Sequence, residues 1–164
     1  MYKYDLDIRF DEWARREWAK RRPAKERGLN KCINCGYCCT KTCVPLPKEL
    51  KLIAKYLNMT VKEMIDTYMV GDENDGYYFL RWANTAQTDL LGEFLPDDRT
   101  YDIGMCILFN ETTRECKIYP VRPVDAREAG CWKKNDEYHT WSMRQWRRGI
   151  LEHLCPDMII DSWR

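Results

Sequence analysis

The chain has 164 residues, of which 45% are hydrophobic and 32% are charged. This balance is typical of a folded globular protein and excludes an intrinsically disordered chain. The formal net charge of +1 gives no overall bias toward nucleic acids or membranes, and no apolar run approaches the ~20 residues of a membrane span.

The first segment of the chain predicts a charged helical arm. Residues 1–10 mix charges with aromatic side chains, which excludes a secretory signal and predicts a cytoplasmic protein. Residues 11–27 predict a helix that Asp11 caps and Gly28 ends. Because tryptophan and arginine dominate interface hot spots, the candidate partner-binding residues of this arm are Trp13, Arg15, Arg16 and Trp18. A solvated charged face is the simpler interpretation.

Two short helices are predicted after the first cysteine-rich segment. Residues 48–58 place apolar side chains at spacings of three and four, which gives a helix with one apolar face. The segment from Thr60 to Glu63 is a capping box, which starts a second helix that Gly71 ends. These two helices are expected to cover the cysteine loop and to supply much of the core.

The second half of the chain predicts short strands, loops and one terminal helix. Residues 71–76 predict a turn, and residues 77–82 predict a strand rich in aromatic side chains. A short hairpin is expected around residues 110–114, followed by a loop over residues 120–132. Residues 138–154 predict the final helix. The fold class expected is α+β: a small, helix-rich single domain with irregular loops, organised around a cysteine-ligated metal or iron–sulfur site.

The chain is expected to divide into three parts along its length. Residues 1–30 form the N-terminal helical arm, and residues 31–135 form the cysteine-cluster domain. Residues 136–164 form a C-terminal helix and tail packed on the same domain. Residues 84–99 contain glycine and proline and predict an irregular surface loop.

The nine cysteines are the strongest functional signal in the sequence. Cytosolic thiols stay reduced, and an odd count leaves one unpaired in any disulfide scheme, so metal binding explains them better. Five lie between positions 32 and 43, and three more lie far downstream, at positions 106, 116 and 131. The first group begins like a bacterial ferredoxin site, but Thr42 stands where that pattern requires the fourth cysteine. The first group therefore supplies only part of a site.

Ordered motifs extend this pattern well beyond the first loop. Cys32-x2-Cys35-x2-Cys38-Cys39 is followed by Met105-Cys106-Ile107-Leu108 and by Cys116-Lys117-Ile118-Tyr119-Pro120-Val121-Arg122-Pro123. Over residues 31–132 this order resembles the YkgJ-type cysteine-cluster family (CxxCxxCC) of zinc- or iron-chelating domains. A related domain in flagellin lysine methylases gives the family at least one enzymatic setting. Ala126 stands where the family usually has a further cysteine.

The residues expected to hold a cofactor are all cysteines. The candidate set is Cys32, Cys35, Cys38, Cys39, Cys106, Cys116 and Cys131, and the metal ligands predicted within it are Cys32, Cys35, Cys39, Cys106 and Cys116. An iron–sulfur cluster of the 4Fe-4S type is favoured, because the loop begins like a ferredoxin site and neither histidine lies near a cysteine motif. Zinc is the alternative, since four thiolates also satisfy a closed zinc site. Cys43 and Cys155 are expected to be buried small hydrophobes.

The predicted function is that of a small iron–sulfur protein that docks on a larger enzyme or complex. It would act there as a redox- or oxygen-responsive regulator or as an electron-transfer accessory, without nucleic-acid binding or membrane insertion. Two alternatives stay open: a metal-dependent enzyme related to protein lysine methylases, and a zinc-stabilised structural module. No sequence motif marks a catalytic site, so no catalytic residue is assigned. His139 and His153 are expected to be structural.

Overall fold

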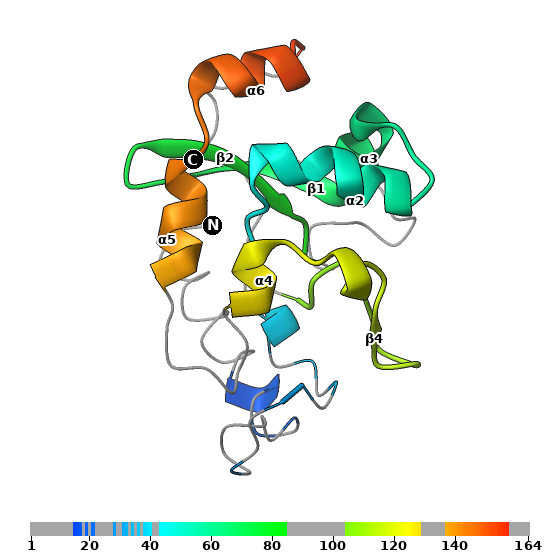
Figure 1. The fold of residues 1–164 in the computed structure, drawn as a ribbon. Coiled ribbons are helices and arrows are strands. Elements are labelled where there is room, and N and C mark those ends of the chain that lie inside the picture. The colour runs from blue at the N-terminus through cyan, green and yellow to red at the C-terminus, as the bar shows by residue number, and fades with distance from the viewer. Residues whose placement is uncertain are drawn as a thin grey trace, which may run out of the picture. The chain divides into compact units, whose positions relative to one another are not determined.

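Figure 1 shows the fold of the chain in a computed structural model. The structure describes residues 15–17, 19, 21, 28, 31, 32, 34, 36, 38–40, 43–84, 104–128 and 137–157. In chain order, the elements are η1 (Cys38–Thr40), η2 (Pro47–Glu49), α2 (Leu50–Tyr56), α3 (Val61–Tyr68), β1 (Met69–Asn74), β2 (Tyr77–Trp82), β3 (Phe109–Asn110), β4 (Glu115–Cys116), η5 (Tyr119–Val121), α4 (Val124–Glu128), α5 (Glu137–Arg144) and α6 (Arg148–Leu154).

The described residues fall into two compact units. The cysteine unit contains the described residues up to Thr40 together with residues 83–84 and 104–116. The helical unit contains residues 43–82, 117–128 and 137–157. The α+β class is confirmed, because helices and small antiparallel sheets occur together. The three-part division into residues 1–30, 31–135 and 136–164 stays a prediction.

The helical unit begins with the two helices that the sequence predicts. The predicted helix over residues 48–58 is present as the η2 turn followed by α2, whose apolar face is buried. The capping box is confirmed, since the Thr60 hydroxyl accepts from the Glu63 backbone N–H at 3.1 Å and the Glu63 carboxylate accepts from the Thr60 backbone N–H at 2.8 Å. These helices contribute Leu50, Ile53, Ala54, Met64 and Ile65 to the core.

A two-stranded antiparallel hairpin, β1–β2, follows α3 directly. The predicted strand over residues 77–82 is confirmed as β2, and it pairs with β1 from Met69 opposite Trp82 to Asn74 opposite Tyr77. The prediction that residues 71–76 form a turn is wrong, because the chain turns only at Asp75 and Gly76, both with positive φ. An Asp-Gly pair is sufficient for a tight hairpin turn. Gly71 therefore lies in a strand and does not end α3.

Residues 117–128 of the helical unit fold differently from the predicted loop over residues 120–132. The η5 turn and the α4 helix occupy most of this stretch. Proline is compatible with the first turn of a helix, where its missing N–H needs no partner. Pro120 lies in the first turn of η5, and the Pro123 carbonyl accepts a hydrogen bond from the Arg127 N–H at 3.0 Å. The two prolines thus start helical turns here.

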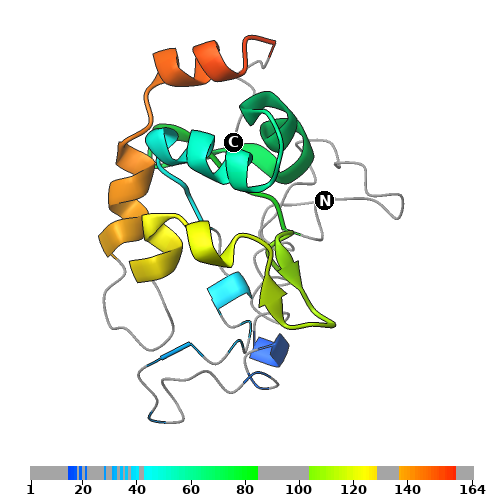
Figure 2. The same ribbon diagram turned by 45° about the vertical axis from the view of Figure 1, so that its right-hand side comes forward.

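The helix predicted over residues 138–154 is divided into α5 and α6, as Figure 2 shows. The break coincides with Trp146, which is buried and whose indole N–H donates to the Pro45 carbonyl at 2.9 Å. Arg147 is extended and precedes the first residue of α6. The indole contact is remote in sequence, which explains why local periodicity did not predict the break.

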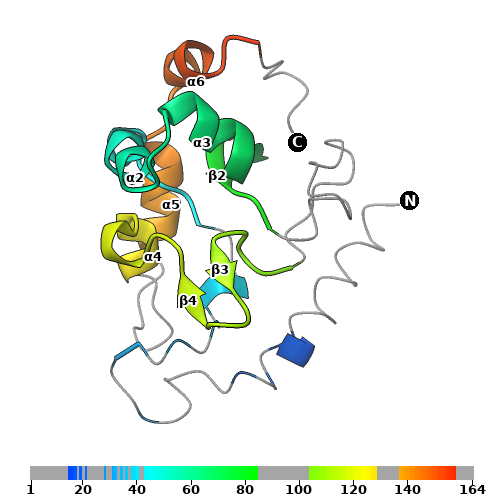
Figure 3. The ribbon, with the colours of Figure 1, turned by 90° about the vertical axis from the view of Figure 1, so that its right-hand side faces the viewer.

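The cysteine unit contains the predicted hairpin around residues 110–114, shown as β3 and β4 in Figure 3. Its strands are only two residues long, and the Asn110 side-chain oxygen accepts from the Thr112 and Thr113 N–H groups in the turn. Of the helix predicted over residues 11–27, residues 15–17, 19 and 21 are helical, and the others lie outside the described residues. Of the irregular segment 84–99, only Asn84 is described. In the part of the chain that the structure describes, no helix is long and apolar enough to cross a membrane.

Candidate metal centre

The cysteine unit holds five of the predicted cofactor-binding cysteines among its described residues: Cys32, Cys38, Cys39, Cys106 and Cys116. Cys35 and Cys131 lie outside the described residues. Cys43 and Cys155 belong to the helical unit. Cys155 is buried, as predicted for a small hydrophobic residue, whereas Cys43 is half-buried.

A backbone hydrogen bond joins the first cysteine segment to the downstream one. The Cys106 N–H donates to the Cys39 carbonyl, with 2.6 Å between nitrogen and oxygen. Cys106 also pairs with Asn84 in an isolated antiparallel bridge, and the next residue, Ile107, donates its N–H to the Ala83 carbonyl at 2.9 Å. Cys106 is therefore held between two segments that are distant from it in sequence.

The β3–β4 hairpin contains Cys116, which belongs to the same unit. Cys116 lies directly opposite Phe109 in the ladder, and the Phe109 N–H donates to the Cys106 carbonyl at 2.9 Å. Cys106 and Cys116 are therefore connected through one residue, Phe109. These contacts link two cysteines that lie ten positions apart in the sequence.

Close packing at Gly36 brings the first cysteine segment against that hairpin. Gly36 is buried with φ of +79°, and its carbonyl accepts from the Cys39 N–H at 3.1 Å in a tight turn. A Cβ atom at this position would lie 2.9 Å from the Phe109 ring and 2.7 Å from an Arg21 guanidinium nitrogen. Only glycine allows this approach together with a left-handed backbone.

The electrostatics of Cys39 indicate that several thiols lie near one another. Burial raises the pKa of the Cys39 thiol far above its usual range, and the nearby Cys106, Cys116, Cys38 and Cys32 thiols raise this pKa further. Thiolates that repel one another in a half-buried site are a poor arrangement without a counter-charge. A bound cation reverses this effect and favours the deprotonated thiolates. The donor chemistry therefore suits a soft metal centre.

The described residues do not by themselves complete a metal site. Among them, no group of three or more histidine, cysteine, aspartate or glutamate side chains is arranged to hold a metal ion. The assignment of Cys32, Cys35, Cys39, Cys106 and Cys116 as metal ligands, and of Cys38 and Cys131 as further cofactor-binding residues, stays a prediction. Around Cys32, the Asn34 N–H donates to the sulfur at 3.4 Å, a contact that can orient a thiolate ligand.

Arg21 is a residue of this unit that the sequence interpretation missed. Its guanidinium contacts the carboxylates of Glu17 at 2.8 Å and Glu111 at 2.6 Å, and it lies 5.8 Å from the centroid of the Phe109 ring. Arg21 thus ties the N-terminal helical residues to the hairpin. The spacing of four between Glu17 and Arg21 is the available sequence signal. Of the predicted partner-binding residues, Arg15 and Arg16 are helical and exposed, and Trp13 and Trp18 lie outside the described residues.

The helical unit contains a second polar cluster, centred on Asp125. This carboxylate is 2% exposed, and one of its oxygens accepts from the Val44 N–H at 2.8 Å. The same oxygen lies 2.8 Å from Nδ1 of His139. His139 therefore connects α5 to α4, which agrees with the structural role expected of it. His153 is exposed.

Comparisons with known proteins bear on the whole cysteine pattern. The CxxCxxCC family, described as "Putative zinc- or iron-chelating domain", matches residues 31–156. An uncharacterized protein from Methanocaldococcus jannaschii is 32% identical over 96 residues, which are 58% of this chain and 41% of that relative. The chain thus spans less than half the length of this relative. No solved structure matches this chain. Because the family match covers more than half of the sequence, this chain belongs to the CxxCxxCC family of metal-chelating cysteine-cluster domains.

Proposed function

We propose that this protein holds an iron–sulfur cluster and docks on a larger enzyme or complex as a redox- or oxygen-responsive regulator or an electron-transfer accessory. The observation that carries the proposal is the hydrogen bond from the Cys106 N–H to the Cys39 carbonyl. It supports a shared site, because it joins the ferredoxin-like segment to the downstream cysteines that could complete the ligation. The family match supports the coarser statement that the domain chelates a metal.

The donor set fits an iron–sulfur cluster by its chemistry. The predicted ligands Cys32, Cys35, Cys39, Cys106 and Cys116 are all thiols, and soft thiolates suit both zinc and iron–sulfur clusters. The ferredoxin-like spacing of the first three cysteines favours a 4Fe-4S cluster over zinc. When bound, such a cluster supplies one-electron redox chemistry. The protein's part is to hold the thiols and to restrict solvent around Cys39.

The shortness of the β3 and β4 strands supports a redox response. Strands of two residues form too few hydrogen bonds to be stable by themselves. Metal ligation of Cys106 and Cys116 would stabilise this hairpin, since the free energy of metal binding is also free energy of folding. Loss of the cluster would then loosen the hairpin and change the surface offered to a partner.

Anaerobic purification of the full chain tests the proposal. We expect a brown protein with about four iron and about four sulfide per chain, the content of one 4Fe-4S cluster. A partner protein should co-migrate with it, and exposure to air should change that association. A colourless protein that contains only zinc rejects the cluster, and unchanged association after complete cluster loss rejects the sensor role.

Zinc is the second candidate, because the description of the matching family names it beside iron. Four of the predicted thiolates would close a tetrahedral structural site, and the domain would then be an interaction module without redox chemistry. The same purification separates the two candidates, since the zinc protein keeps its metal and its association in air.

A further inference from the structure

The outer face of α2 in the helical unit carries large apolar side chains in solvent. Leu52 is 60% exposed and Tyr56 is 49% exposed, whereas Leu50, Ile53 and Ala54 on the opposite face are buried. Residues four apart lie on the same side of a helix, so Leu52 and Tyr56 form one exposed apolar strip. The helix therefore packs with one face and presents a second apolar face to its surroundings.

Three lysines accompany this strip. Lys48, Lys51 and Lys55 are exposed, and none forms an ion pair with a described residue. The acidic residue of this stretch, Glu49, is directed toward the backbone, where its carboxylate accepts from the Leu46 N–H at 2.8 Å and the Val124 N–H at 3.0 Å. Positive charge thus accumulates beside the apolar strip.

Other helices of the same unit balance their surface charge differently. In α3, Lys62 pairs with Asp66 at 2.7 Å, and in α6, Arg148 pairs with Glu152 at 2.9 Å, each at a spacing of four. Such pairs are the usual arrangement on a solvated helix. The helix α2 has no carboxylate on its outer face. Its surface charge would be complemented by carboxylates from another molecule.

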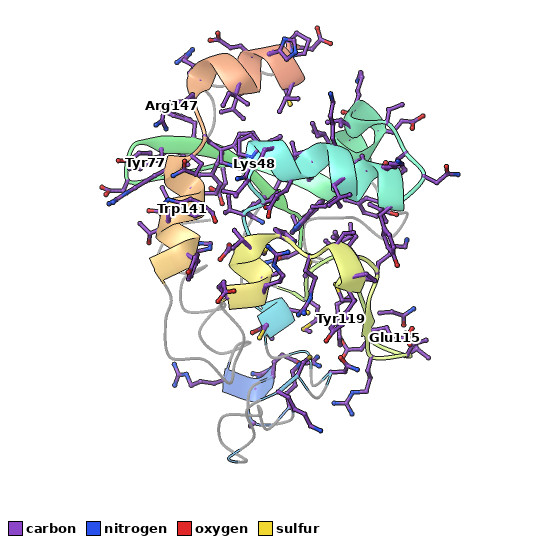
Figure 4. The ribbon with its side chains drawn as sticks, viewed as in Figure 1. Lys48, Tyr77, Glu115, Tyr119, Trp141 and Arg147 are labelled. Atoms are coloured by element: carbon purple, nitrogen blue, oxygen red, sulfur yellow. The ribbon has the colours of Figure 1, made fainter. Side chains whose placement is uncertain are left out.

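The η5 turn contacts α2 within the helical unit, and it also carries an exposed aromatic side chain. Tyr119 is 44% exposed, and the Arg122 guanidinium lies 4.0 Å from the centroid of its ring. The Arg122 Nε also donates to the Tyr119 carbonyl at 3.1 Å, so the cation is held in a defined position. Figure 4 labels Lys48, in the η2 turn just before α2, and Tyr119, in the η5 turn.

We propose that the α2–η5 surface, formed by Lys51, Leu52, Lys55, Tyr56, Tyr119 and Arg122, docks an acidic segment of a partner protein that also carries large apolar side chains. This inference rests on the proposed function and names the chemistry of the partner. Carboxylates of the segment pair with the lysines and Arg122, and its apolar side chains cover Leu52 and Tyr56. Aromatic residues and arginine are enriched in the buried centre of protein–protein interfaces.

Two other classes of ligand fit this surface less well. Single-stranded nucleic acid needs open aromatic faces for stacking, whereas Arg122 covers one face of Tyr119 and the strip contains the aliphatic Leu52. An anionic membrane gains only a small electrostatic attraction from each basic residue near its surface. The helix is also short, and its other face already contributes to the core.

A peptide-display experiment on the full, metal-loaded chain tests the inference. A library of short random peptides is selected against the purified protein, and the binding of selected peptides is then measured by fluorescence anisotropy. The test variants are Lys51→Glu/Lys55→Glu and Leu52→Ser, all at exposed positions. Lys62→Glu on α3 is the control for charge reversal, because Lys62 is an exposed helical lysine outside the surface. Circular dichroism and metal content establish that each variant is folded and loaded.

The expected result is enrichment of peptides that combine Asp or Glu with Leu, Phe or Trp. The double lysine variant should weaken their binding about tenfold or more, as the loss and reversal of two charge pairs implies. Leu52→Ser should also weaken binding, added salt should weaken it further, and Lys62→Glu should leave it unchanged.

Three outcomes overturn the inference: no enrichment of acidic peptides, binding that survives the double lysine variant, or tighter binding of a single-stranded RNA or of phosphatidylserine vesicles through the same lysines. If any of these occurs while the protein contains iron and sulfide, only the docking surface fails. If acidic peptides bind but the protein holds only zinc, the redox role fails and the docking surface stands.

Discussion

Replacement of Gly36 by alanine would place a methyl group against the Phe109 ring and the Arg21 guanidinium. The new Cβ would lie 2.9 Å from the ring and 2.7 Å from the Arg21 nitrogen. The guanidinium of Arg21 can move, because it lies at the end of a flexible side chain. Phe109 is only 9% exposed, and its backbone is fixed by pairing with Cys116. The cysteine segment would therefore have to shift away from the hairpin.

Two costs contribute to the expected destabilisation. A left-handed backbone costs a residue other than glycine about 1–2 kcal/mol, and forcing an extra methyl group into a packed site costs about 1–3 kcal/mol. Gly76 offers a matched control, because its φ of +80° is close to the +79° of Gly36, but a Cβ atom added there would meet nothing within 4 Å. Gly76→Ala should therefore cost about 1–2 kcal/mol, and Gly36→Ala about 2–5 kcal/mol.

Urea unfolding of both variants measures these costs, and the metal content per chain measures their effect on the site. We expect Gly36→Ala to lose more unfolding free energy than Gly76→Ala and to retain less metal. Equal losses of free energy in the two variants, with equal metal content, would refute the close approach of the cysteine segment to Phe109.

Three further predictions concern the helical unit. Asp125→Ala leaves the buried Val44 N–H without its acceptor and should cost about 1–3 kcal/mol in urea unfolding. A cost below about 0.5 kcal/mol, which is typical of an exposed ion pair, would contradict the buried role of Asp125. Thr60→Ala removes the N-cap of α3 and should lower the free energy of unfolding by about 1 kcal/mol. An unchanged free energy of unfolding would contradict this role of Thr60. Burial raises the pKa of the Cys155 thiol in the folded protein. The protonated thiol therefore contributes fully to the free energy of unfolding below the usual pKa of about 8.5, and this contribution is lost as pH rises through the raised pKa of the folded state. Cys155→Ala should flatten that decline in unfolding free energy above pH ~8.5, and identical pH profiles would argue against it.

Local signals in the sequence were sufficient for part of the fold. The capping box at Thr60 predicted the start of α3, and the aromatic run predicted β2 with its observed limits. These signals depend on neighbouring residues alone. The strand β1 was missed, because its polar residues find their partners across the hairpin, as when Asp72 accepts from Arg81 Nε at 2.6 Å.

Contacts between remote segments explain the other misses. The division between α5 and α6 depends on the hydrogen bond from Trp146 to the Pro45 carbonyl, which helical periodicity cannot reveal. The cysteine spacing indicated which residues could bind a metal, but it could not indicate that Cys39 and Cys106 meet through the backbone. The role of Arg21 likewise depends on Glu111, far along the chain.

The metal content of cysteine variants tests the central claim most directly. Cys116→Ser removes a thiol of the hairpin, Cys106→Ser removes the thiol that precedes it, and Cys155→Ser is the control at a buried cysteine of the helical unit. After anaerobic purification, the first two variants should lose most of their iron and sulfide, while the control keeps the wild-type content. Wild-type iron and sulfide in both the Cys106 and the Cys116 variant would contradict a cluster shared between the first cysteine segment and the downstream cysteines.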